Sequence, residues 1–426
     1  MIRVSGEKAI SITESIFSRP LHDKPSHTLH YGSIGKGVDD VLVSVFRAPH
    51  SYTGENGTEI SCHGSPYIVQ RILELLIENG ARQALPGEFT QRAFLNGKMD
   101  LSQAEAVADL IASTNKATHQ MAMSQMRGQF SGELARLNDK LLHLASLLEL
   151  ELDFSDQEVE FANRDELTSV ANEVRNRIKL LTDSFQTGNA LKSGVPVAII
   201  GAPNVGKSTL LNYLLGDDKA IVSNIQGTTR DLIEDVVQIG GITFRFIDTA
   251  GIRKTRDQIE KLGIERTLKA AERASIIILL TEDGVPFPDV RFSDDQKVRS
   301  VINKCDASLP GSSFLYHKRT AGTQFHVSAL TGDGLPLLKE ALVREAAIPE
   351  IQENDTIVSN VRHYQALKKA YASISRVLEG ISTGIPSDLA AQDLRDCIHQ
   401  LSEITGTTIA SEDVLKSIFS KFCVGK

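Results

Sequence analysis

The sequence predicts a multidomain protein in which an α+β N-terminal domain precedes an α-helical domain, and an α/β domain is inserted into the helical one. Three observations predict this architecture. Short apolar runs and helical patterns alternate near the N-terminus and again in the middle of the chain. Long helical patterns lie on both sides of the middle block, and a domain with neighbouring termini tolerates such an insertion. We expect the N-terminal domain at residues 1–96, the helical domain at 97–190 and 355–426, and the α/β domain at 194–347.

The composition is that of a soluble protein with two or three domains. The chain has 426 residues, of which 41% are hydrophobic and 23% are charged, and both fractions are ordinary for globular proteins. No apolar run approaches the roughly 18 residues of a membrane span, and the start lacks a signal-peptide pattern, so we expect a cytoplasmic protein without membrane contact. The net charge of -8 argues against a stand-alone nucleic-acid binder. The four cysteines have no metal-ligand spacing, and disulfides are not expected in a reducing compartment: Cys62, Cys305, Cys397 and Cys423.

The N-terminal block combines short strands with short helices. Strand-forming residues dominate two runs, at 41–46 and 58–62. Pro66 to Asn79 predicts a helix with one apolar face and with Gly80 as its stop. A Pro-Gly turn at 86–87 then leads into a short helix that reaches Phe94.

From Asp100 onward the apolar residues follow a helical period, and we expect each stripe to pack in a core. A linker to the α/β domain is expected at Gly188 to Gly194. Helical character returns at 361–380 and from Ser387 to the end of the chain. The three stripes are Leu101, Ala104, Val107, Ala108 and Ile111; Leu134, Leu137, Leu141, Leu144 and Leu148; and Leu167, Val170, Val174, Ile178 and Leu181.

The middle block opens with a phosphate-binding pattern. The apolar run 197–200 predicts a buried strand, Gly201 to Ser208 follow the spacing G-x4-G-K-S, and a helix starts at Thr209. In this setting backbone N–H groups and the helix N-terminus face phosphate oxygens. Lys207 would reach the β- and γ-phosphates, and the Ser208 hydroxyl would bind Mg²⁺. A plain Gly-rich turn is the alternative for this motif taken alone.

Three later motifs select the nucleotide. Asp248 to Gly251 follow the strand-like run 243–247, so that Asp248 is expected to hold Mg²⁺ through water. Asn303 to Asp306 follow the apolar run 298–302, and a carboxylate there accepts two hydrogen bonds that guanine offers and adenine does not. Ser328 to Leu330 complete the set. The order of these motifs predicts a Ras-like P-loop GTPase domain.

The segment after the phosphate loop predicts the switches. Ser223 to Asp231 have the pattern of a first switch, in which Thr229 would complete the Mg²⁺ coordination; a threonine-rich turn is the alternative. Ile252 stands where Ras-like enzymes place a glutamine that orients the attacking water. Catalytic help must then come from elsewhere in the chain, from an ion or from a partner. Asn204 offers one route, because its side-chain oxygen and the first switch could hold a monovalent cation, although it could also only shape the loop.

Several longer motifs resemble one family from end to end. The chain resembles the tRNA modification GTPases called MnmE or TrmE. The resemblance rests on GAPNVGKS, IQGTTRD, DTAGIR, IEKLGIER, PGEFTQRAFLNGK, DLSQAEA, YTGE, CHG and the ending FSKFCVGK.

The resemblance assigns roles to particular residues. It implies that Glu260 is the catalytic residue, orienting the attacking water through a second water. It implies Mg²⁺ at Ser208 and Thr229, K⁺ at Asn204, Ser223, Ile225 and Thr228, and a folate site at Arg3, Glu59, Lys98 and Lys426. With the motifs, the residues expected to contact GTP are Asn204, Val205, Gly206, Lys207, Ser208 and Thr209; Ser223, Asn224, Ile225, Gln226, Gly227, Thr228 and Thr229; Asp248, Thr249, Ala250 and Gly251; Asn303, Lys304 and Asp306; and Ser328, Ala329 and Leu330.

The resemblance also implies a reaction and partners. Family members add a carboxymethylaminomethyl or aminomethyl group to C5 of the wobble uridine of certain tRNAs. They do so with the FAD-dependent partner MnmG, as a heterotetramer, and they take one carbon from a 5-formyl or 5,10-methylene tetrahydrofolate in an N-terminal domain that also makes a homodimer. K⁺-dependent pairing of the GTP-binding domains activates hydrolysis, and tRNA is bound mainly through the complex.

Two departures and two alternatives complete the prediction. Relative to the family the chain begins inside the first strand, so we expect a shortened N-terminal domain. The stretch 281–297 is short and holds Pro286 and Pro288, so a helix usual in such domains is expected to be missing or irregular. The alternatives are a ribosome-assembly GTPase of the Era or Der type and a scaffold GTPase whose output is a change of dimer shape.

Overall fold

The chain is described here by a computed structural model that divides into two compact units. The first unit holds Met1–Ala112, Ala122–Lys179 and Gln365–Lys426, and the second holds Ser113–Met121 and Leu180–Tyr364. The structure describes residues 1–153, 164–216, 235–247, 271–286, 292–293, 296–307, 324–346, 355–383, 387–407, 415, 418–419 and 422.

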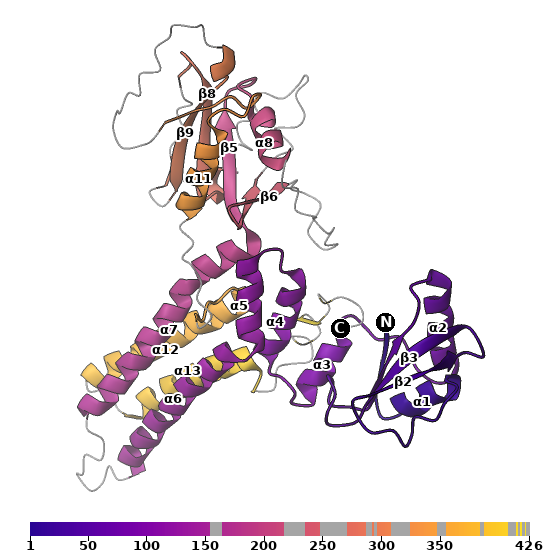
Figure 1. Ribbon diagram of the computed structural model, residues 1–426. Helices are drawn as coiled ribbons and strands as arrows, with labels where there is room; N and C mark the ends of the chain where they lie inside the picture. Colours follow the sequence, from indigo (N-terminus) through magenta and orange to yellow (C-terminus); the bar gives the residue numbers. More distant parts are fainter. Residues whose placement is uncertain are drawn as a thin grey trace. The chain divides into compact units, whose positions relative to one another are not determined.

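The N-terminal part of the first unit is a four-stranded sheet with helices on one face (Figure 1). The strands are β1 (Ile2–Ser5), β2 (Thr28–Ile34), β3 (Asp39–Phe46) and β4 (Gly57–Ser61), in the antiparallel order β1-β4-β3-β2. Helices α1 (Ala9–Ile16) and α2 (Pro66–Glu78) supply the core with the inward residues of the sheet. Val41, Val43 and Val45 alternate along β3 and are buried, as the period of a strand requires. The strands and the helix predicted here are confirmed.

Helix α3 (Glu88–Leu95) starts where the Pro-Gly turn was predicted. Gly87 has φ +70, and a Cβ there would lie 2.6 Å from the Phe419 carbonyl oxygen. The turn therefore needs glycine twice, for its left-handed backbone and for this close approach. Phe419 and Phe422 belong to a small core with Leu101 and Ala104, so these two phenylalanines pack beside α3 and α4 (Leu101–Ala112).

The helical part follows the predicted stripes closely. Its elements are α5 (Lys116–Met126), α6 (Gln129–Asp153), α7 (Arg164–Ser193), α12 (Val361–Thr383) and α13 (Ser387–Thr405). The stripe from Leu134 to Leu148 is buried throughout and belongs to α6, which packs against α13. Ile111 is 40% exposed, so its predicted core position is wrong, because it lies at the last turn of α4 where the apolar face runs out.

The predicted linker at Gly188 to Gly194 is wrong as well. Helix α7 continues through Ser193, and Gly194, at φ +82, marks its end. A Cβ on Gly188 would lie 2.2 Å from the Val358 carbonyl oxygen. Another backbone segment approaches the helix at this point and leaves no room for a side chain, which explains the glycine.

The second unit contains a six-stranded sheet with apolar clusters on both faces. Its strands are β5 (Val195–Gly201), β6 (Asp235–Ile239), β7 (Ile242–Phe246), β8 (Ile276–Glu282), β9 (Lys297–Asn303) and β10 (Phe325–His326). The order is β10-β9-β8-β5-β7-β6, and only the β6–β7 pair is antiparallel. Helices α8 (Lys207–Gly216) and α11 (Leu335–Ala346) fill one of these clusters. The carboxyl ends of the parallel strands thus meet at one edge, where ligands bind in such sheets.

Two further expectations concern absences. Among the residues described between β8 and β9, which are 283–286, 292–293 and 296, none is helical. The other residues of this stretch, including Pro288, lie outside the described residues, so the missing or irregular helix stays a prediction. Within the described ranges, no helix combines the length and the apolar character that a membrane crossing requires.

Candidate functional site

The phosphate loop has the predicted strand-loop-helix form. It joins β5 to α8, and Gly201 pairs with Leu280 of β8 so closely that a Cβ would lie 2.3 Å from the Leu280 carbonyl oxygen. Asn204 and Gly206 have φ values of +65 and +94. These left-handed residues turn the chain sharply before the first turn of α8, where Ser208 and Thr209 lie. Such a turn lets successive N–H groups converge on an anion.

The Asn303 side chain connects three of the predicted motifs. Its Nδ2 donates to the Val205 carbonyl oxygen at 2.8 Å, and its Oδ1 accepts from the Ala329 N–H at 2.9 Å. Asn303 is buried, and a Cβ on Gly206 would lie 2.2 Å from its Nδ2. The phosphate loop, the Asn303–Asp306 motif and the Ser328–Leu330 motif are therefore held as one hydrogen-bonded cluster.

Asp306 is held by the last of these motifs. The Ser328 hydroxyl donates to Asp306 Oδ1 at 2.6 Å and itself accepts from the Thr331 N–H at 3.1 Å. Ser328 is fully buried. This chain of hydrogen bonds fixes the carboxylate that is expected to read the guanine base. Leu330, by contrast, is 77% exposed.

Two lysines of the predicted site contact protein groups in this structure. Lys207 Nζ donates to the carbonyl oxygens of Gly201 and Ala202, both at 2.7 Å, and burial lowers the pKa of Lys207. A phosphate would offer this amine charged acceptors in place of neutral ones, which favours the charged form. Lys304 has φ +64 and pairs with Glu282.

Several predicted residues lie outside the described residues, so their roles stay predictions. They are Ser223, Asn224, Ile225, Gln226, Gly227, Thr228 and Thr229; Asp248, Thr249, Ala250 and Gly251; Glu260; and Lys426.

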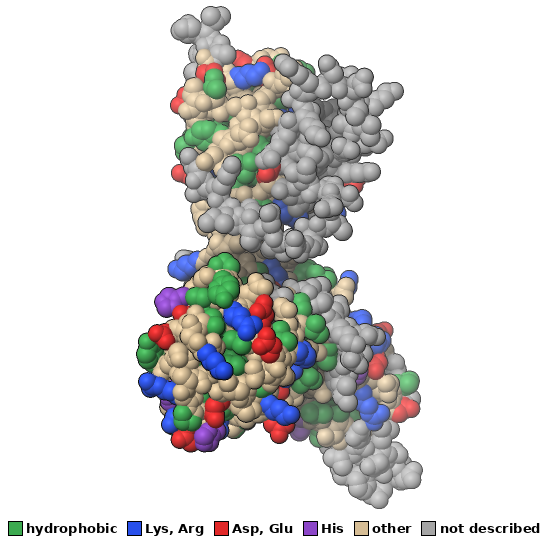
Figure 2. Space-filling model, turned by 90° about the vertical axis from the view of Figure 1, so that its right-hand side faces the viewer, with side chains coloured by type: hydrophobic (Ala, Val, Ile, Leu, Met, Phe, Trp, Pro, Cys, Tyr) green, Lys and Arg blue, Asp and Glu red, His purple; other side chains and the backbone are tan. Residues whose placement is uncertain are grey.

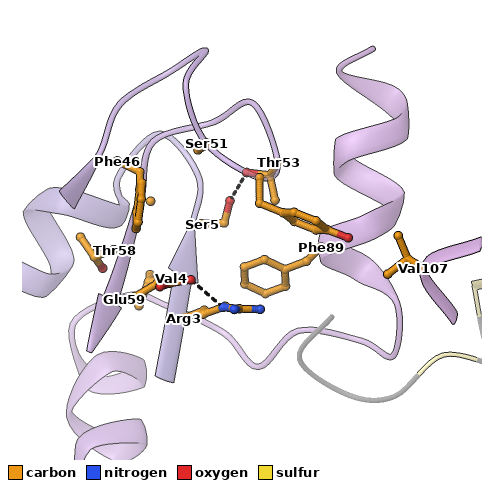
Figure 3. A pocket seen from close by; sticks show the side chains of 12 residues that line it. Arg3, Val4, Ser5, Phe46, Ser51, Thr53, Thr58, Glu59, Phe89 and Val107 are labelled. Atoms are coloured by element: carbon orange, nitrogen blue, oxygen red, sulfur yellow. Dashed lines mark hydrogen bonds and ion pairs between the residues drawn. The ribbon is translucent and has the colours of Figure 1, made fainter. Parts of the chain in front are cut away.

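A second site lies in the N-terminal part. A cavity of about 390 Å³ opens on the sheet, and both Arg3 and Glu59 line it. These two residues face each other across β1 and β4, and Arg3 Nε donates to Glu59 Oε1 at 2.7 Å. Figure 3 shows the Phe46 and Phe89 rings on opposite sides of this cavity. A few polar groups between aromatic walls are typical of a small-molecule site.

Lys98 is not among the residues that line the cavity. Its Nζ donates to the Pro49 carbonyl oxygen at 3.1 Å. Sequence reasoning also missed the aromatic walls, Phe46, Tyr52 and Phe89, because they come from three separate elements. Phe89 and Tyr52 did carry a signal, since they lie within the PGEFTQRAFLNGK block and the YTGE motif.

Burial weakens two of the thiols as nucleophiles. It raises the pKa of Cys305, and it raises the pKa of Cys397 to about 12. A thiol with such a pKa stays protonated at neutral pH. No group of three or more His, Cys, Asp or Glu residues with metal-binding geometry occurs among the described residues.

The fold and the motif cluster around Asn303 define a P-loop GTPase domain. Matches to family models identify the N-terminal and helical parts of the chain. Residues 1–98 match the model of the GTP-binding protein TrmE N-terminus, and residues 101–423 match the model of the MnmE helical domain. The chain belongs to the MnmE family of tRNA modification GTPases.

Relatives match over the full length. The tRNA modification GTPase MnmE of Phocaeicola vulgatus is 49% identical over 480 residues, and that of Bacteroides fragilis is 51% identical over 448 residues. Each alignment covers 100% of this chain and 96% of the relative. Among solved structures, the G domain of the T. maritima FeoB iron transporter covers 36% of this chain and 98% of its own, with 25% identity and a TM-score of 0.26. A TM-score this low supports no inference.

Proposed function

We propose that this protein is a K⁺-activated GTPase that acts with the FAD-dependent partner MnmG. Together they would add the carboxymethylaminomethyl or aminomethyl group to C5 of the wobble uridine of certain tRNAs. The observation that carries the GTPase part is the Asn303 cluster, which joins the phosphate loop to the guanine motifs by hydrogen bonds of 2.8 and 2.9 Å. The tRNA part rests on membership of the MnmE family. The matches to its N-terminal and helical models favour this function over the Era or Der type.

The residues of the phosphate loop fit the ions that this function needs. Asn204 is exposed on the loop, and Ser208 lies at the first turn of α8. Ser208 would hold Mg²⁺ with Thr229, and Asn204 would hold K⁺ with Ser223, Ile225 and Thr228. Positive charge at this place stabilises the negative charge that develops on the transferred phosphoryl group. Glu260 would orient the attacking water, which Ile252 cannot do.

The cavity of the N-terminal part fits a reduced folate. Its volume of about 390 Å³ lies in the range of small-molecule sites. Glu59 can accept hydrogen bonds from the amino edge of a pterin, and the cationic Arg3 suits a carboxylate. Bound there, a 5-formyl or 5,10-methylene tetrahydrofolate supplies the one-carbon unit. Lys98 and Lys426 would bind its outer carboxylates, and Lys98 would then exchange its bond to Pro49.

The face of the N-terminal sheet that lies away from α1 and α2 also supports a homodimer. Tyr31 and Leu42 pair across β2 and β3 on the face away from α1 and α2, and they are 56% and 39% exposed. A second copy would cover these side chains in a cytoplasmic dimer. On the face shown in Figure 2, cationic and anionic side chains of the N-terminal part are interspersed. The net charge of -8 supports tRNA binding mainly through the complex with MnmG.

K⁺ is expected to accelerate GTP hydrolysis by the purified protein, and Na⁺ is not. The reason is that the Asn204 side-chain oxygen and main-chain oxygens of the first switch would form a site beside the phosphates that suits K⁺ better than the smaller Na⁺. Phosphate release at equal ionic strength in the two chloride salts measures this effect. Equal rates in both salts would refute the potassium assignment.

Deletion of the gene is expected to leave the wobble uridines of the substrate tRNAs without the C5 group. Nucleoside analysis of bulk tRNA by mass spectrometry measures this loss. A plasmid copy of the gene should restore the modified nucleoside, and a copy with Lys207→Ala should not. Unchanged wobble uridines in the deletion strain would refute the modification role.

A further inference from the structure

Helix α3 holds the loop that forms one wall of the N-terminal cavity. Ser51, Tyr52 and Thr53 of this loop line the cavity. The Tyr52 hydroxyl lies 2.9 Å from Thr90 Oγ1, and Asn96 Nδ2 donates to the Thr53 carbonyl oxygen at 2.8 Å. Thr90 belongs to α3, and Asn96 is the residue directly after this helix.

Arg92 of α3 makes a charged contact with the same loop, at Glu55. Its Nη1 donates to both carboxylate oxygens of Glu55, at 3.2 and 3.1 Å. Glu55 Oε2 also accepts from the Ser5 hydroxyl at 2.9 Å, and Ser5 lies 2.7 Å from Thr53 Oγ1 (Figure 3). Glu55 therefore connects Arg92 to β1, the strand that carries Arg3.

Arg92 is itself held by Glu88, the residue beside Phe89. Arg92 Nη2 donates to Glu88 Oε1 at 2.7 Å, and Arg82 Nη1 donates to Glu88 Oε2 at 2.8 Å. The hydrogen bond from Arg82 is the main cause that lowers the pKa of Glu88 to about 2. Glu88 thus stays ionised at neutral pH, and Arg92 has a carboxylate on each side.

This network has a consequence for the cavity. We propose that Arg92 is a positioning residue for the ligand of the N-terminal cavity, acting through Glu55 on the loop 51–55 and through Glu88 on Phe89. Arg92 is not itself among the residues that line the cavity. Loss of its guanidinium leaves Glu55 without this cation and Glu88 with Arg82 alone, so both the loop 51–55 and the start of α3 that carries Phe89 lose a charged contact.

This inference rests on the folate site proposed above. The experiments give different results if the folate site is absent and if Arg92 has no positioning role. Full-length protein carrying Arg92→Gln is expected to bind 5-formyltetrahydrofolate at least about tenfold more weakly, because hydrogen bonds to charged groups are lost. Glu55→Gln should weaken binding through the same loop, and the two losses should not add in the double variant. Titration calorimetry measures the affinities, and GTP hydrolysis and thermal unfolding confirm that each variant is folded.

Arg71 provides a matched control. It pairs with Glu74 and Glu78 at 3.0 and 3.2 Å, and its side chain is 34% exposed against 32% for Arg92. It lies on α2 and does not line the cavity, so Arg71→Gln should keep the wild-type affinity. Wild-type affinity in Arg92→Gln, or additive losses in the double variant, would overturn the proposal.

Hydrogen exchange tests the positioning without any ligand. The amides of residues 51–55 are expected to exchange faster in Arg92→Gln than in the wild type and in Arg71→Gln. If the wild type does not bind the folate, the folate assignment fails, and exchange still decides whether Arg92 holds the loop. Unchanged exchange in Arg92→Gln would overturn the positioning role.

Discussion

Asp306→Asn is expected to weaken GTP binding by about 10³-fold or more and to improve XTP binding. The Asp306 carboxylate is fixed by the Ser328 hydroxyl at 2.6 Å, so it cannot turn away to relieve a mismatch. An asparagine can present its amide N–H donors where guanine also presents donors, and such a mismatch, once the bound base covers it, produces strong discrimination. Xanthine has an oxygen where guanine has its 2-amino group, and this oxygen accepts from the new amide. Nucleotide competition with a fluorescent GTP analogue measures both affinities.

Asp333→Asn is the control for this exchange. Asp333 lies on the segment that carries Ser328 and accepts from the Thr331 hydroxyl at 2.7 Å, without belonging to the predicted guanine-reading set. This variant should bind GTP as the wild type does. Wild-type GTP affinity in Asp306→Asn would show that the base is read elsewhere.

Glu260→Ala is expected to slow GTP hydrolysis by about 10²- to 10⁴-fold, which is the usual contribution of a positioned acid or base. GTP affinity should stay unchanged, because Glu260 would contact water and not the nucleotide. Ile252 stands where Ras-like enzymes place a glutamine, and it cannot polarise a water molecule, so this task would fall to Glu260. Single-turnover hydrolysis in K⁺ buffer and nucleotide titration measure the two quantities.

Glu265→Ala is the matched control, because it removes a carboxylate from the same IEKLGIER stretch. It should leave the turnover close to that of the wild type. A Glu260→Ala protein that hydrolyses GTP at the wild-type rate would leave the catalytic role to another residue. Glu260 lies outside the described residues, so this prediction rests on the sequence resemblance.

Local patterns predicted most of the fold. The run 298–302 became β9, the apolar stripe of α6 is buried, and the Pro-Gly turn starts α3. These patterns succeed because strand and helix periods are properties of a short window. Gly188 misled the prediction, because glycine in a linker and glycine under a crossing backbone look alike in sequence. The approach of Val358 to Gly188 joins positions 170 residues apart, which no local pattern contains.

The candidate sites were likewise predictable only in part. Asn303 was predicted as a nucleotide residue from its motif, and the structure adds its bonds to Val205 and Ala329. Those bonds could not be predicted, because the motif states residue types and not which backbone groups they meet. Arg3 and Glu59 were expected at one site from resemblance, and their direct pairing across β1 and β4 supports a common site. The aromatic walls around them come from three elements that only the fold brings together.

The bonds of the Asn303 amide also bear on how the two halves of GTP communicate. Its donor side steadies the phosphate cradle through Val205, while its acceptor side steadies the base pocket through Ala329. Because one planar group serves both, a fragment that holds the amide in place for one half also holds it in place for the other. Guanosine and inorganic pyrophosphate, offered as separate fragments, would therefore help each other to bind, and this synergy is set by the protein before any chemistry begins.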